Sequence, residues 1–75
     1  MTGSMHLRRI NPDRNIARFY TMSVQPNLFV EWSLLREWGP IDSAGRLVSG
    51  CFASEHEAAL AMAVHLRAKL SNGYE

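Results

Sequence analysis

The sequence predicts an α+β fold, in which an antiparallel sheet of about four strands carries one C-terminal helix on one face. Two observations predict the strands: several stretches alternate between apolar and polar residues, and short polar connectors separate them. A third predicts the helix, because one stretch near the C-terminus combines a capping sequence with helical spacing. The 75 residues, 47% of them apolar, suffice for one small domain. We expect residues 6–75 to form it and residues 1–5 to be a disordered or non-native leader.

The first two strands are predicted on either side of a polar turn. Residues 5–10 read as a short edge strand, and the turn follows over residues 11–15. Residues 17–25 form the second strand, which places Tyr20, Met22 and Val24 on one face. Residues 26–27 are a short connector, so this strand and the next should form an antiparallel hairpin.

The third strand is expected over residues 28–38, the longest of the four. Trp32 and Trp38 have the same parity, so both should point to one face. Gly39 and Pro40 should end the strand, since proline cannot donate a ladder hydrogen bond. After a loop, residues 46–52 form the last strand, in which Cys51 is expected to be half-buried. It is the only cysteine, so no internal disulfide exists, which fits a reducing cytosol and a cytoplasmic protein.

The helix is predicted over residues 54–71. Ser54 and Glu57 form a capping box, and Gly73 suits a left-handed position after the last turn. The helical spacing predicts a sheet-facing stripe of five apolar residues. These are Ala59, Met62, Ala63, Leu66 and Leu70.

Composition and motifs exclude several functional classes. No apolar run approaches the ~20 residues of a membrane span. The three histidines lack metal-ligand spacing with the cysteine or the acids, so we expect no metal and no cofactor. No phosphate-binding glycine loop or nucleophile elbow occurs, so we expect neither enzymatic activity nor a small-molecule substrate. The net charge is only +1, but residues 1–50 hold six arginines against four acids, so any basic surface lies there.

The motifs resemble, in order, those of the WGR domain family, found in DNA-damage-activated poly(ADP-ribose) polymerases and as short bacterial proteins. The resemblance covers residues 6–75. Asn15 with the run Arg18, Phe19 and Tyr20 resembles the opening strand of the family. The stretch from Trp32 to Trp38 and Gly39 resembles the central strand and the naming tripeptide. Residues 52–58 resemble the strand-to-helix step, and residues 72–74 the aromatic tail.

This resemblance implies a non-catalytic binding module with weak, sequence-independent binding to the sugar-phosphate backbone or the ends of DNA. In the family, the tripeptide tryptophan packs on the backbone, basic residues contact phosphate, and the tripeptide arginine links to neighbouring domains. Here Pro40 replaces that arginine, which removes one cation. The nucleic-acid-binding residues implied are Trp38, Gly39, Arg36, Arg18, Arg46 and Tyr74.

Each of these assignments has a structural alternative. Trp38 either stacks on DNA or packs in the core, where Trp32 is expected, and the arginines either contact phosphates or are solvated. Tyr74 either completes the packing of the helix on the sheet or touches a ligand. The alternative function is a protein-interaction or self-association module without nucleic-acid binding, for example through an exposed edge strand.

Overall fold

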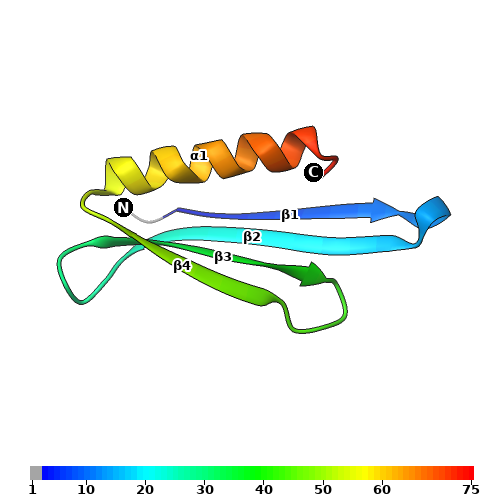
Figure 1. Cartoon of the computed structure of the whole chain (residues 1–75), viewed down its shortest axis with the longest axis horizontal. Coiled ribbons are helices and arrows are strands. Elements are labelled where there is room, and N and C mark those ends of the chain that lie inside the picture. The colour runs from blue at the N-terminus through cyan, green and yellow to red at the C-terminus, as the bar shows by residue number, and fades with distance from the viewer. Residues whose placement is uncertain (1–2) are drawn as a thin grey trace.

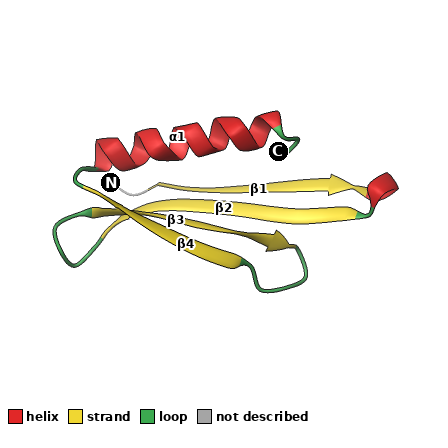
Figure 2. Cartoon of the chain, in the orientation of Figure 1, coloured by secondary structure: helices red, strands yellow, loops and turns green. Residues whose placement is uncertain are grey.

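The computed structural model describes residues 3–75 and places four strands and one α-helix in the predicted order (Figure 1). The elements are β1 (Gly3–Asn11), the short 3₁₀ helix η1 (Pro12–Arg14), β2 (Ile16–Pro26), β3 (Trp32–Pro40), β4 (Arg46–Phe52) and α1 (Glu55–Ser71). Neighbouring strands pair antiparallel in the order β1-β2-β3-β4, and α1 lies across one face (Figure 2). The α+β prediction is confirmed. Of the predicted leader, residues 1 and 2 lie outside the described residues, whereas residues 3–5 form the start of β1.

The core lies between the sheet and α1. Tyr20, Met22 and Val24 are buried on the helix-facing side of β2, as their alternation predicted, and Leu34 joins them from β3. Trp32 also lies on this side and packs against the core, as expected. The prediction for Cys51 was wrong, because the odd-numbered residues of β4 face the open side of the sheet, where this thiol is exposed.

The start of β3 differs from the prediction. Residues 28–31 form a turn instead of the beginning of a strand, and β3 starts at Trp32, opposite Pro26. The reason is local: the Oδ1 atom of Asn27 accepts hydrogen bonds from the backbone N–H groups of Phe29 (2.9 Å) and Glu31 (3.1 Å). An asparagine side chain that bonds backbone two residues ahead stabilises a turn against the ladder. The β2–β3 hairpin is confirmed, with a longer connector than expected.

The end of β3 also differs, because pairing with β2 continues through Pro40, which lies opposite Arg18. Ile41, the next residue, donates its N–H to the carbonyl of Ala17 at 3.1 Å. Since successive backbone groups point to alternate sides, the nitrogen of Pro40 faces away from β2. On that side the pairing with β4 has ended at Trp38, so the missing N–H of proline interrupts no ladder hydrogen bond.

The helix begins as predicted, because the N–H of Glu57 donates to Ser54 Oγ at 3.1 Å. The carboxylate of Glu57 accepts from the N–H of Ala53 at 3.2 Å. The sheet-facing stripe is rotated by about one residue from the prediction. Ala59, Ala63 and Leu70 are exposed, whereas the partly or fully buried positions are Glu55, Ala58, Ala61, Met62, His65, Leu66 and Lys69. Because α1 carries apolar residues on nearly every side, spacing alone could not select the buried face.

The chain after α1 returns to β1. Gly73 adopts a φ of 93°, the left-handed conformation predicted for it. Glu75 then exchanges two backbone hydrogen bonds with Arg8, of 3.0 and 2.9 Å, along the outer edge of β1. This pairing places Tyr74 under the end of the helix, where it is buried against Tyr20.

Candidate nucleic-acid interface

Trp38 lies near the end of β3, directly opposite Tyr20 on β2 and Arg46 on β4. Its ring stacks on Tyr20 with 5.8 Å between centroids and 22° between planes. Arg36, two residues earlier on the same face, places its guanidinium carbon 5.4 Å from the centroid of the Trp38 ring. Arg36 also donates from Nη1 to the hydroxyl of Tyr20 at 3.3 Å. The indole is therefore held in one orientation and remains partly exposed.

Two exposed arginines flank this tryptophan on the same face. Arg46 is its cross-strand partner, and Arg18 lies opposite Pro40, one diagonal step away on β2. Arg9 of β1 lies directly opposite Arg18. Like charges placed opposite one another on a sheet face destabilise it, and a bound anion would relieve that repulsion.

The helix adds a further positive charge. The Nζ atom of Lys69 lies 4.8 Å from the ring centroid of Tyr20 and 5.6 Å from that of Tyr74. Burial, and then the positive charges of Arg36 and Lys69, lower the pKa of His65 below its usual value of 6.5. Arg36 and Lys69 therefore both lie close enough to His65 to disfavour its charged form, in addition to the larger effect of burial.

No carboxylate of the sheet offsets this charge on the same face. The helix-facing positions are the odd-numbered residues of β1 and the even-numbered residues of β2, β3 and β4. None of these positions holds aspartate or glutamate. We call the assembly the aromatic–basic cluster, and it consists of Trp38, Tyr20, Arg9, Arg18, Arg36, Arg46 and Lys69. Figure 1 shows the end of β3, the β1–β2 turn and the end of α1 at the same end of the molecule.

Four of the six residues implied by the resemblance belong to this cluster. The other two, Tyr74 and Gly39, contribute to packing. The ring of Tyr74 meets Tyr20 edge to face, 6.0 Å between centroids, so it packs the helix end on the sheet. Gly39 faces the open side, where an added Cβ would lie 3.1 Å from the Cα of Gly45. Its lack of a side chain permits close packing of the β3–β4 loop.

Sequence reasoning missed two cationic members of the cluster, Arg9 and Lys69, and assigned Tyr20 only to the core. Arg9 shares its parity with Leu7, whose packing against the core identifies the helix-facing side of β1. Lys69 follows His65 by four residues and so lies on the same side of α1. Both signals are present in the sequence, but they require the strand register and the buried face of the helix to be known.

The fold and the cluster define a small sheet-and-helix module with an aromatic residue set among cations on one face. The family model of the WGR domain matches residues 3–75, and the chain belongs to this family. An uncharacterized protein of Sinorhizobium fredii, y4dW, is 40% identical over 70 residues, which are 93% of the chain and 34% of that protein. The chain thus spans about a third of the length of this curated relative. No solved structure matches the chain significantly.

Two other kinds of feature are absent from residues 3–75. The helix is not long and apolar enough to cross a membrane. Histidine, cysteine, aspartate and glutamate side chains nowhere in this range form a group that could hold a metal ion.

Proposed function

We propose that this protein binds DNA weakly and without sequence preference, by contacting the sugar-phosphate backbone or the ends of a duplex through the aromatic–basic cluster. The observation that carries the proposal is the partly exposed ring of Trp38, flanked by Arg36 and Arg46 on a face without carboxylates. Membership of the WGR family, a family of nucleic-acid-binding modules, agrees with this assignment.

The members of the cluster have different roles in this proposal. Arg36 is held by Tyr20 and by the indole, so it orients the ring and contributes charge from a fixed position. Arg18 and Arg46 are exposed, which leaves their guanidinium groups available to phosphate oxygens. Arginine contacts to phosphates position a protein on nucleic acid but carry no sequence information.

The expected affinity is low. Pro40 replaces the family arginine, so the edge has one cation fewer, and the net charge of the chain is only +1. With two or three phosphate contacts, the logarithm of the association constant should fall with the logarithm of salt concentration at a slope of about −2 to −3.

The test is a fluorescence anisotropy titration of a labelled, 5′-phosphorylated duplex at several salt concentrations. Replacing both Arg18 and Arg46 with glutamine should reduce the slope by about 2, since each phosphate contact contributes about 0.9. Arg8→Gln is the matched control, because Arg8 is exposed on the open face of the sheet. No binding at very low salt, strong preference between duplexes of equal length, or equal effects of the control and the double variant would contradict the proposal.

A second candidate function, self-association, has an observation of its own. The turn between β2 and β3 exposes three adjacent large apolar side chains, Leu28, Phe29 and Val30. Contiguous exposed apolar surface is typical of sites that contact another molecule. The turn lies at the end of β3 opposite to Trp38, so the two functions would use separate surfaces.

A further inference from the structure

The turn before β3 presents an apolar tip, residues 28–30, at one end of the sheet. Leu28 is 95% exposed, Phe29 80% and Val30 93%. Single exposed apolar residues are common on protein surfaces, but three consecutive and nearly fully exposed ones are not. The tip therefore requires an explanation beyond the packing of this chain.

Hydrogen bonds also hold the tip in a defined conformation. Asn27 ties it at both ends, through the hydrogen bonds to Phe29 and Glu31 and through Nδ2, which donates to Ser33 Oγ at 3.3 Å. Val30 has a φ of 60°, a left-handed conformation that is costly for a β-branched residue. Backbone strain of this kind persists where surrounding interactions enforce it, commonly at functional segments. The turn thus holds its apolar side chains outward at an energetic cost.

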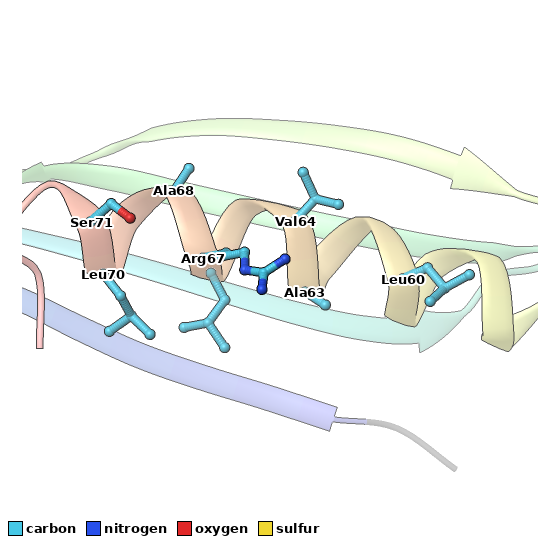
Figure 3. Close-up of a pocket in the computed structure, with 8 residues that line it drawn as sticks. Leu60, Ala63, Val64, Arg67, Ala68, Leu70 and Ser71 are labelled. Carbon is cyan, nitrogen blue, oxygen red and sulfur yellow. The ribbon is translucent and has the colours of Figure 1, made fainter.

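The outer face of α1 carries an apolar groove. It is an open depression of about 780 Å³, lined by Leu60, Ala63, Val64, Leu66, Arg67, Ala68, Leu70 and Ser71 (Figure 3). Leu60 is 55% exposed, Val64 68% and Leu70 51%. Figure 3 shows Leu70 directed towards β1, Val64 and Ala68 on the other side, and Arg67 between them. The groove is a second apolar surface without a partner in this chain.

The tip and the groove match in apolar character and are opposite in charge. The tip is a projecting apolar group followed directly by the acidic Glu31, and the groove is a shallow, open apolar surface of one helix that contains the basic Arg67. A tip docked in the groove would bring Glu31 and Arg67, which carry opposite charges, together within an apolar contact, which favours the correct partner and register.

The two surfaces cannot meet within one chain. The tip continues from the paired residues Pro26 and Trp32 at the end of the sheet, and α1 packs on that same sheet with the groove on its outer side. We propose that the tip of one copy docks in the helix groove of a second copy, head to tail. Such a heterologous contact leaves a free tip and a free groove, so copies add to form rings or open chains. The proposal uses no residue of the aromatic–basic cluster and does not depend on DNA binding.

The test uses two single variants of the full chain, Phe29→Asp in the tip and Val64→Asp in the groove. Both residues are exposed, so the variants should keep the wild-type helix signal and melting temperature. The wild type should rise in mass beyond a dimer between micromolar and millimolar concentrations in sedimentation velocity. Each variant alone should weaken self-association at least tenfold. An equimolar mixture should form a one-to-one complex that grows no further, because one intact tip meets one intact groove.

The charge pair gives an independent check. Glu31→Arg or Arg67→Glu alone should weaken assembly. A mixture of the two should restore assembly with alternating copies, because the tip of each variant then meets a groove of opposite charge on the other. A wild type that stays monomeric at millimolar concentration would overturn the proposal. So would self-assembly of one variant but not the other, which indicates a tip–tip or groove–groove contact. A monomeric chain that sediments with neutral phosphatidylcholine vesicles through its tip would also overturn it, and would assign the tip to a lipid surface.

Discussion

Replacing Trp38 with alanine separates the packing contribution of this residue from its proposed contact with DNA. The indole stacks on Tyr20 at 5.8 Å, lies 5.4 Å from the guanidinium of Arg36, and is only partly buried. Deletion of a fully buried aromatic ring costs about 3–5 kcal/mol. The aromatic pair accounts for about 0.5–1.5 kcal/mol, and the cation–π contact for about 0.5–1 kcal/mol.

Because one side of the ring remains open to solvent, the cavity term is smaller than in a closed core. We therefore expect Trp38→Ala to lower the free energy of unfolding by about 2–3 kcal/mol. For a domain of this size each kcal/mol shifts the melting temperature by about 4–8 °C, so the shift should be about 10–20 °C. Trp38→Phe should cost about half as much, since it keeps an aromatic partner for Tyr20.

The assays are thermal and urea unfolding followed by far-ultraviolet circular dichroism, and DNA titration well below the melting temperature of the variant. On the proposed function, Trp38→Ala loses DNA binding while it is still folded, and Trp38→Phe keeps part of it. A stability loss below about 0.5 kcal/mol, which is typical of surface substitutions, would refute the packing described for the ring. Unchanged DNA affinity in the folded alanine variant would refute its role in binding.

Three further predictions test the core, the loop and the charge environment. Ala58, fully buried under α1, should not tolerate Ala58→Asp, which should cost about 3 kcal/mol or more because it buries an unpaired charge. Ala59→Asp, on the exposed side of the same helix turn, should change the unfolding free energy by less than about 0.5 kcal/mol; equal melting temperatures would refute the assigned face. Gly45→Ala should lower stability by about 1–3 kcal/mol, because its Cβ would lie 2.6 Å from a phenylalanine ring carbon and 2.7 Å from a backbone oxygen. Gly50→Ala, whose Cβ would make only an ordinary 3.6 Å contact, should be neutral in urea unfolding, and a larger loss there than at position 45 would contradict the loop packing. Finally, burial and nearby positive charges lower the pKa of His65 in the folded state, so unfolding takes up protons and stability should fall as the pH drops from about 6.5 through that lower pKa. His65→Gln should flatten this part of the profile of melting temperature against pH, and an unchanged profile would exclude this residue as its cause.

The accuracy of the sequence predictions varied with how local the determining interactions are. The alternation of Tyr20, Met22 and Val24 identified the buried face of β2. Alternate side chains of a strand point to the same face of the sheet, and that whole face lies either towards the core or towards solvent. The start of β3 was predicted wrongly, because strand-forming residues 28–30 follow an asparagine whose side chain stabilises a turn. Strand propensity describes fit to a pleated surface, and here the turn leaves these residues outside that surface.

The candidate site was only partly accessible from sequence for a related reason. Arg36 and Trp38 share a strand, so their common face follows from parity alone. Arg46 lies beside them because β3 and β4 pair antiparallel with Trp38 opposite Arg46. Arg9 and Lys69 come from elements far apart in the chain, and their approach depends on the register of β1 and on the rotation of α1.

The sequence by itself determined the order of the strands and the helix, the capped start of α1, and the placement of Trp32 and Trp38 on one face. These features depend on neighbouring residues, on periodicity and on short connections, all of which act over a few positions of the chain. Only the tertiary structure decided which side of α1 is buried, because a helix with apolar residues on nearly every side has no clearly preferred face until it packs on the sheet. Packing and register likewise gathered the cations around Trp38 and left residues 28–30 exposed, since both outcomes depend on contacts between distant segments.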